Sequence, residues 1–432
     1  MRQNDIRRHT LSMLDFNQLK ALVAHATRKE GGQFYRRLYG MSAEAPAMDI
    51  TSLEEWQALP VVTKDDLIAH PLEERSFLPL SKLDHLRASS GTSGKPPLFS
   101  PRTHVRNMEY RLQHHDFKNA FLAFTVPLMP HWHEQFQAEH GRAVPVVVHD
   151  PKRPAATARL AAAAGVDAFS VFAYHVVPLG EEMKKVGMNE RIRFIEITGE
   201  ICSRVQYEYI RTTFPNAKIL QSYNSSEVED AHIGMPCKRI DGTEPLAVYH
   251  PKETHYLELI DATNGSVLTP ESGVEGDLLV TAYAGEPTSF PLVRFRIGDT
   301  VRLVEETCAH GTWSFTVLGR TDMDFLKVPG GILRADEIAR VLKRMPERVS
   351  DVFELHASEI ATPSGPKLKV VLHVETRGDT DLLALAADIS TMMRVAPSMT
   401  YADGVASKRY VPLTCQLLKL VPGGKTKRII RD

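Results

Sequence analysis

The chain has little cysteine, with four residues among 432. So few thiols at such distances do not make the disulfide framework that stabilises small secreted domains. Long apolar runs are also missing, since no stretch approaches the roughly 20 consecutive apolar residues that cross a bilayer. The opening letters MRQNDIRRHT are polar, and the apolar segment of a secretory signal does not follow them. We therefore expect a cytoplasmic protein in a reducing compartment, without a membrane-embedded segment.

An excess of one charge is absent as well. Lysine and arginine number 52 and the acidic residues 53, which gives a formal net charge of -1. Binding along a nucleic acid backbone requires a basic excess, so we expect no nucleic acid partner. Hydrophobic residues make up 43% of the chain and charged residues 24%, as in an ordinary globular protein. A length of 432 residues exceeds one compact core, so a large domain and a smaller one are expected.

The pattern of apolar residues predicts an α/β fold. The first third has helical spacing near residue 20, and Thr51 with Glu54 predicts a capping box at another helix. Between about residues 143 and 220, short apolar runs alternate with helical segments, which is typical of βαβ units and a partly parallel sheet. From Tyr256 the helices disappear, and the runs YLELI, DLLVT, VRLV and WSFTVL predict a β-rich subdomain.

The last quarter of the sequence predicts a compact unit of its own. A linker is expected at residues 318–322. Beyond it, a helix near residues 337–344, the strands VSDVFELH and KLKVVLHV, and a helix through LLALAADI predict a small α+β domain. The predicted division is a core of residues 1–319 and a C-terminal lid domain of residues 320–432.

The run SSGTSGKP at residues 89–96 is the most informative segment. Glycines let backbone N–H groups turn toward an anion, hydroxyls add donors and lysine adds a positive charge, so the run is suited to phosphate. It lacks the G-x-x-x-x-G-K-[ST] spacing of a P-loop. A plain flexible loop is the alternative. The candidate phosphate-binding residues are Ser89, Ser90, Gly91, Thr92, Ser93, Gly94 and Lys95.

This run resembles the phosphate loop of the adenylate-forming superfamily, which contains acyl-CoA ligases, luciferases and peptide-synthetase adenylation domains. Four further runs resemble its motifs in the expected order: QSYNSSE at 221–227, FRIGD at 295–299, GRTD with FLKVPGG at 319–331, and GGKTKR at 423–428. The openings at 21–40 and 53–67 are similar to the phenylacetate-CoA ligase branch. The resemblance implies a large N-terminal domain with βαβ sheets and a β-rich subdomain, and a small mobile α+β C-terminal domain.

The resemblance implies that ATP activates a carboxylic acid, expected to be aromatic, to an acyl-AMP with release of pyrophosphate. Lys425 would stabilise charge at the α-phosphate, and Glu227 would hold Mg²⁺. Asp299 would accept hydrogen bonds from the ribose hydroxyls, Tyr223 would face the adenine, and Arg320 would lie near ribose or phosphate. The other residues that the resemblance places at ATP or AMP are Gly199, Glu200, Ser222, Asn224, Ser225 and Ser226.

A second half-reaction follows from the same resemblance. The small domain would turn about Asp322, so that Lys425 leaves and Gly330 with Gly331 approaches the acyl acceptor. Coenzyme A is the expected acceptor, with a carrier-protein thiol or an amine as alternatives. A nucleotide sensor without turnover is a remote alternative, because a sensor should lack Lys425. The sequence lacks the catalytic-loop motifs of kinases, which argues against a kinase. A homodimer is one candidate for the oligomeric state, which the sequence leaves open.

Two cysteines and two histidines form a second pattern: Cys237, His250, Cys308 and His310. Thiolates and imidazoles are ligands of tetrahedral zinc. The phenylacetate-CoA ligase branch often has a cysteine, a histidine and a C-x-C-G pair at similar places, and His310 replaces the second cysteine of that pair. The resemblance implies a structural zinc ion, and packing of the side chains without metal is the alternative.

Two departures from the branch fall where the acyl group should lie. Asn224 replaces the usual glycine after Tyr223, and residues 125–141 bear little likeness to the glycine-rich acyl-pocket segment of that branch. The sequence therefore leaves the identity of the acid open.

Overall fold

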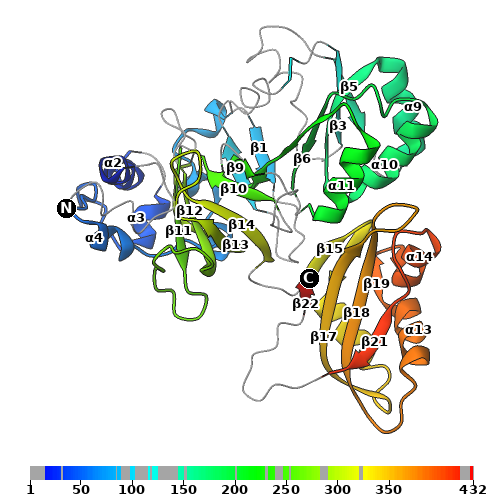
Figure 1. Ribbon diagram of the computed structural model, residues 1–432. Coiled ribbons are helices and arrows are strands. Elements are labelled where there is room, and N and C mark those ends of the chain that lie inside the picture. Colours follow the sequence, from blue (N-terminus) through cyan, green and yellow to red (C-terminus); the bar gives the residue numbers. More distant parts are fainter. Residues whose placement is uncertain are drawn as a thin grey trace.

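The computed structural model describes residues 15–30, 33–83, 85–88, 98–102, 115–116, 119–124, 145–149, 153–199, 202–228, 232–238, 247–252, 254–282, 290–320, 325–418 and 429–431. Figure 1 shows two bodies, with the sheets of residues up to about 320 above and to the left and those of the C-terminal part below. None of the helices in these ranges is long and apolar enough to cross a membrane.

Short helices form the N-terminal part: α2 (Phe16–Ala26), α3 (Phe34–Leu38), α4 (Leu53–Gln57), α5 (Lys64–Ala69), α6 (Leu72–Arg75) and the 3-10 turn η1 (Leu80–Lys82). The expected capping box of Thr51 and Glu54 is wrong by one residue. Ser52 caps α4 instead, accepting a hydrogen bond from the backbone amide three residues later. This start places Leu53 and Trp56, one helical turn apart, on the buried face of the helix.

A parallel sheet with the strand order β4-β3-β5-β6-β7 forms one half of the large body. Its strands are β3 (Ala120–Phe124), β4 (Val146–His149), β5 (Val166–Val171), β6 (Phe194–Ile197) and β7 (Lys218–Gln221). Helices α9 (Pro154–Ala164), α10 (Ala173–Lys185) and α11 (Arg204–Thr213) run beside it (Figure 1). The predicted βαβ alternation is confirmed. All carboxyl ends of these strands meet at one edge, where open α/β sheets bind their ligands.

A second sheet has the order β11-β12-β13-β14-β10-β9-β8. Its strands are β8 (Tyr223–Asn224), β9 (His232–Lys238), β10 (Val248–Pro251), β11 (His255–Ile260), β12 (Glu275–Ala282), β13 (Leu292–Glu305) and β14 (Ser314–Arg320). A separate hairpin pairs β1 (His85–Ala88) with β2 (Phe99–Arg102). Because β8 follows β7 after one residue, the chain passes from the parallel sheet into the β-rich sheet at the carboxyl edge of β7.

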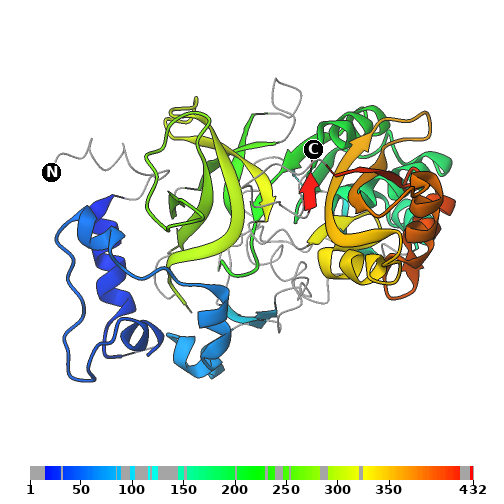
Figure 2. The ribbon, with the colours of Figure 1, turned by 90° about the horizontal axis from the view of Figure 1, so that it is seen from below.

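The C-terminal part contains a sheet with the order β21-β18-β17-β22. The strands are β17 (Val349–Ile360), β18 (Lys367–Thr376), β21 (Thr414–Leu417) and β22 (Ile429–Arg431), with the hairpins β15 (Phe325–Val328) to β16 (Gly331–Arg334) and β19 (Arg394–Ala396) to β20 (Met399–Thr400). Helices α12 (Ala335–Leu342), α13 (Leu382–Met392) and α14 (Tyr401–Ala406) accompany it. Figure 2 shows the C-terminal strands seen from below, beside the large body.

The apolar side chains gather in two separate cores. One core takes residues from Leu19 to Val317, and the other takes residues from Val328 to Ile429. The predicted fold class, an α/β body with a β-rich part and a small α+β part, is confirmed. Strand β14 continues through Arg320, so the first three residues of the expected linker at 318–322 are strand, and this part of the linker prediction is wrong. The boundary after residue 319 remains a prediction.

Candidate functional site

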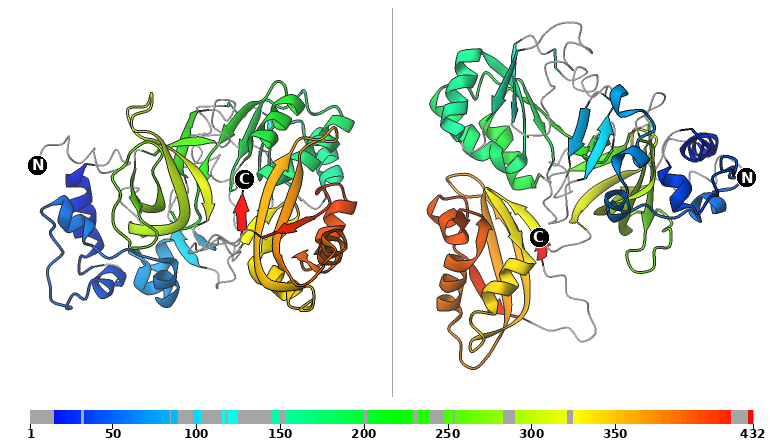
Figure 3. Two further views of the ribbon diagram at one scale, coloured as in Figure 1. Left: turned by 60° about the horizontal axis from the view of Figure 1, so that its bottom comes forward. Right: turned by 180° about the vertical axis from the view of Figure 1, so that it is seen from behind.

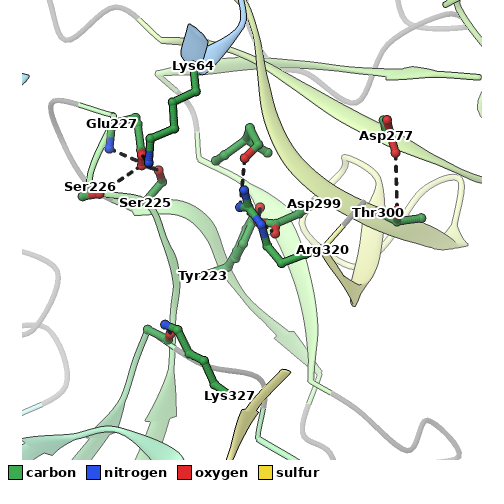
Figure 4. A network of polar contacts seen from close by, with 12 residues as sticks. Lys64, Tyr223, Ser225, Ser226, Glu227, Asp277, Asp299, Thr300, Arg320 and Lys327 are labelled. Atoms are coloured by element: carbon green, nitrogen blue, oxygen red, sulfur yellow. Dashed lines mark hydrogen bonds and ion pairs between the residues drawn. The ribbon is translucent and has the colours of Figure 1, made fainter. Parts of the chain in front are cut away.

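Three predicted nucleotide residues meet where the two sheets join. The hydroxyl of Tyr223 on β8 donates to Oδ2 of Asp299 at 2.6 Å, and a guanidinium nitrogen of Arg320 lies 3.1 Å from Oδ1 (Figure 4). Asp299 and Arg320 are direct cross-strand partners in β13 and β14. Arg320 also donates to the carbonyl of Ile297 at 2.9 Å. The antiparallel register therefore fixes this pair, and the start of β8 brings in the tyrosine ring.

Gly298 makes room for this pair. Its backbone has a φ of +84°, which only glycine adopts without strain. A Cβ atom at this position would lie 2.6 Å from a guanidinium nitrogen of Arg320. The glycine of the FRIGD run is thus needed both for the backbone conformation and for the close approach of the arginine.

The Asp299 carboxyl is largely buried beside a positive charge. Burial raises the pKa of the carboxyl, although the charge of Arg320 and the hydrogen bond from Tyr223 oppose that shift. The side chain is 13% exposed, so little water reaches it. A buried carboxyl needs hydrogen-bond donors because water does not supply them, and the two ribose hydroxyls of a nucleotide are suitable donors.

A second carboxylate, Glu227, lies in the loop after β8. Its Oε1 accepts from Nζ of Lys64 at 3.2 Å, and its Oε2 accepts from the hydroxyls of Ser225 at 2.6 Å and Ser226 at 3.0 Å. Burial raises the pKa of Glu227, but the Lys64 ammonium and the three hydrogen bonds together outweigh burial and hold the pKa below its ordinary value. Glu227 is therefore a charged carboxylate, the form that binds a hard cation such as Mg²⁺.

The carboxyl edge of the parallel sheet carries the next predicted residues. The amide of Asn224 donates to Oγ1 of Thr198 at 2.6 Å and to Oγ of Ser222 at 3.1 Å. The Ser222 hydroxyl in turn lies 3.4 Å from the buried carboxylate of Glu196. Gly199 follows directly after Thr198. The structure thus places these predicted residues along one edge, with the Ser222 hydroxyl turned into the interior.

Several predicted residues lie outside the described residues: Ser89, Ser90, Gly91, Thr92, Ser93, Gly94, Lys95, Glu200, Asp322 and Lys425. Their roles stay predictions. Sequence reasoning missed Lys64, which α5 brings to Glu227 from 163 residues away in the chain. Its segment TKDDL signals a helix start through the capping box of Thr63 with Asp66, but no local pattern indicates the long-range contact.

Lys327 also reaches this edge from the C-terminal part. Its Nζ lies 3.4 Å from the carbonyl of Gly199 and 5.9 Å from the ring centre of Phe172. Figure 4 shows Lys327 on the side of the network opposite to Lys64. The strand β15 that carries Lys327 therefore contacts the carboxyl edge of the parallel sheet.

Four possible metal ligands come together on the β-rich sheet. Strand β9 carries Cys237, strand β10 carries His250, and the segment after β13 carries Cys308 and His310. Their ligand atoms all lie within 4.8 Å of one another. The Nδ1 atom of His310 lies 3.8 Å from the sulfur of Cys237 and 3.6 Å from that of Cys308. A tetrahedral zinc ion with bonds of about 2.0–2.3 Å places its ligands roughly 3.5 Å apart, so these separations suit zinc.

Two further features of this cluster suit a metal ion. The Nδ1 atom of His250 is buried and has no hydrogen-bond partner among the described residues. Burial, with His310 stacked on it at 4.0 Å between ring centres, lowers the pKa of His250 to about 4. His250 is therefore a neutral imidazole, which is the form that binds a metal ion, and its Nδ1 is not used by another described residue.

Solved structures of adenylate-forming enzymes have a similar fold. The crystal structure of 2-hydroxyisobutyryl-CoA ligase with 2-HIB-AMP and CoA, in the thioesterification state, matches with a TM-score of 0.61 and 17% identity, covering 98% of this chain and 91% of that one. The same ligase in its postadenylation state matches with a TM-score of 0.57 and 16% identity, covering 99% and 91%. At such low identity these likenesses concern the fold.

Sequence relatives point to one branch. Phenylacetate-coenzyme A ligase of Thermus thermophilus is 26% identical over 363 residues, which cover 79% of this chain and 77% of the relative. The enzyme of the same name from Aromatoleum evansii is 22% identical over 459 residues, covering 97% and 94%. That from Pseudomonas putida is 22% identical over 390 residues, covering 87% and 82%. No protein-family model matches the chain.

Proposed function

We propose that this chain, a member of the adenylate-forming superfamily with sequence similarity to phenylacetate-CoA ligases, is an AMP-forming acid–thiol ligase. It activates a carboxylic acid with ATP to an acyl-AMP, releases pyrophosphate, and transfers the acyl group to coenzyme A. The contact of Asp299 with Tyr223 and Arg320 is the observation that supports this proposal most directly. The resemblance to phenylacetate-CoA ligases favours an aromatic acid. A carrier-protein thiol or an amine is the alternative acceptor.

In the first half-reaction, each described residue has a role that its geometry suits. Asp299 accepts hydrogen bonds from the ribose hydroxyls, and Arg320 keeps that carboxylate in place. Glu227 would hold Mg²⁺, which when bound would neutralise charge on the phosphates. Lys64 donates to one oxygen of Glu227 and favours the charged carboxylate. Lys425, which lies outside the described residues, would stabilise the charge that develops at the α-phosphate.

In the second half-reaction, the C-terminal part turns about Asp322 so that a thiol reaches the acyl-AMP. The contact between Lys327 and Gly199 is consistent with β15 lining this edge during the transfer. Attack by the thiol on the acyl carbonyl releases AMP, and the thiol proton passes to a base or to water. When the C-terminal part turns, Lys425 would leave the site and the turn at Gly330 would enter it, so that one site serves both half-reactions.

The test of this proposal is ATP–pyrophosphate exchange against a panel of aryl, arylacetic, hydroxy, fatty and amino acids. We expect exchange that depends on one class of acid, and a loss of about a hundredfold in Lys425→Ala, because one charge-stabilising group contributes on this scale. Binding of AMP without exchange for any acid would contradict the proposal and favour a nucleotide sensor. Formation of ADP in place of AMP would indicate a kinase or ATPase.

We also propose that Cys237, His250, Cys308 and His310 hold one structural zinc ion. The sulfur-to-nitrogen distances and the buried Nδ1 of His250 support it. When bound, the ion would join strand β9, strand β10 and the segment after β13, and so would stabilise the β-rich sheet without taking part in acyl transfer.

Metal content tests the zinc proposal. The purified protein should contain about one zinc ion per chain by mass spectrometry of the elements, because four such ligands complete the coordination of a structural site. Cys308→Ala should reduce the content to background and lower the melting temperature, since zinc binding contributes to folding. The matched control is Cys415→Ala, because Cys415 is also buried but lies in the C-terminal core. Equal zinc in both variants would contradict the assignment.

A further inference from the structure

The turn between β15 and β16 is fixed from several sides. The hydroxyl of Tyr410 donates to the carbonyl of Pro329 at 2.7 Å. Gly330 has a φ of +90°, and a Cβ atom there would lie 3.1 Å from the methyl group of Met399 and 2.6 Å from a guanidinium nitrogen of Arg409. The guanidinium of Arg409 therefore lies directly against the backbone of this turn.

The position of Arg409 is set by its backbone. Its amide donates to the carbonyl of Gly404 at 3.0 Å, and its carbonyl accepts from the amide of Leu368 at 3.1 Å. The neighbouring Lys408 is also exposed and has a φ of +60°, a conformation that a non-glycine residue adopts only when its surroundings hold it there. Two adjacent exposed cations thus stand in sequence here, and the guanidinium of Arg409 lies beside the turn.

Among the described residues, no carboxylate forms an ion pair with Arg409 or Lys408. Within the described ranges, the Arg409 guanidinium makes its side-chain polar contact with the sulfur of Met399 at 3.6 Å, which is a weak acceptor. The nearby acid Asp403 accepts from Thr400 at the start of α14. Arginine has five N–H donors in a planar fork, so most donors of Arg409 are available to a ligand.

This corner lies close to the candidate site. Lys327, three residues before Gly330, reaches the carbonyl of Gly199 at the carboxyl edge of the parallel sheet. An extended chain covers at most about 3.6 Å per residue, so the turn lies within roughly 11 Å of the Lys327 backbone. The rear view in Figure 3 shows β15 and the C-terminal unit facing the large body across this region. Arg409 therefore lies against the same hairpin, β15 to β16, whose Lys327 contacts the candidate site.

We propose that Arg409, with Lys408 beside it, binds a phosphate group of coenzyme A and so selects a phosphate-bearing acceptor over a free amine. The inference rests on the proposed function. In coenzyme A the thiol and the phosphates lie at opposite ends, so the phosphates belong at the rim of the site rather than at the reacting atoms. An arginine fork donates two parallel hydrogen bonds to phosphate, and the adjacent lysine adds charge.

Acyl transfer from the acid found by pyrophosphate exchange tests this inference, with coenzyme A, dephospho-coenzyme A and pantetheine as acceptors. In Arg409→Ala we expect KM for coenzyme A to rise about tenfold, because a charge-assisted hydrogen bond contributes on this scale. The kcat should stay within about twofold, and KM for pantetheine, which has no phosphate, should not change. A tenfold effect that vanishes with dephospho-coenzyme A assigns Arg409 to the 3′-phosphate, and an effect that persists assigns it to the diphosphate.

The matched control is Arg159→Ala, because Arg159 is an exposed arginine on α9, away from the turn (Figure 1). Arg409→Lys should recover part of the affinity if charge is what matters. An unchanged KM for coenzyme A, or an equal rise in KM for pantetheine, would overturn the inference. Absence of exchange, or exchange without transfer to coenzyme A, would refute the proposed function, whereas normal transfer with an unchanged KM in Arg409→Ala would overturn this inference alone. These two failures are therefore distinguishable.

Discussion

Replacing Asp299 with alanine should lower kcat/KM for ATP in pyrophosphate exchange by about a thousandfold. The substitution removes the acceptor for the Tyr223 hydroxyl and for the Arg320 guanidinium, and the acceptor that the ribose would use. Loss of one partner from a desolvated, hydrogen-bonded charge pair costs about 2–5 kcal/mol, and a factor of ten corresponds to about 1.4 kcal/mol. The measurement is exchange at limiting ATP with the acid in excess.

Tyr223→Phe is the graded control for Asp299→Ala. It removes one O–H donor and keeps the ring, so we expect a loss of about tenfold. Thermal unfolding with and without AMP separates a binding defect from a folding defect, since AMP should raise the melting temperature of the unsubstituted protein and leave that of Asp299→Ala unchanged. An Asp299→Ala protein with undiminished kcat/KM for ATP would remove the nucleotide role of the Tyr223, Asp299 and Arg320 cluster.

Gly331→Ala should lower the free energy of unfolding of the C-terminal unit by about 3 kcal/mol or more. A Cβ atom at Gly331 would lie 1.9 Å from the carbonyl oxygen of Val395, which belongs to β19. Contacts this short do not occur, so β16 and β19 must separate, and overpacking of this kind costs about 1–3 kcal/mol where relaxation is easy and more where backbone must move. Urea unfolding followed by circular dichroism gives the change.

Gly378→Ala provides the comparison for Gly331→Ala. Gly378 has a φ of +63° with nothing within 4 Å of an added Cβ, so its substitution tests backbone conformation alone. We expect it to cost about 1 kcal/mol, the scale of a non-glycine residue in that region. Equal destabilisation by the two substitutions would mean that the contact with Val395 is not the cause. The larger effect at Gly331 would explain why a glycine stands at the start of β16.

The local pattern of the sequence predicted most elements of the large body. Alternating apolar runs and helical segments between residues 143 and 220 predicted strands β4 to β7 and helices α9 and α11, because the period of apolar residues depends on which face each element buries. Helix α10, which contains Pro178, was missed. The predicted start of α4 was wrong by one residue, because a helix capped by Ser52 buries both Leu53 and Trp56. The linker overlapped β14 because pairing of Arg320 with Asp299 extends that strand.

For the candidate site too, the sequence predicted the groups, and the tertiary structure decided their contacts. The sequence by itself determined the candidate groups: the order of the five motifs, the carboxylates at 227 and 299, and two cysteines with two histidines, which are residue types that bind zinc. Only the tertiary structure decided which of these groups meet and what else joins them. The register of β13 and β14 sets Arg320 against Asp299, α5 brings Lys64 to Glu227 across 163 residues, and the β15 turn places Arg409 beside Gly330. Such contacts depend on the packing of distant elements, and no local periodicity encodes that packing.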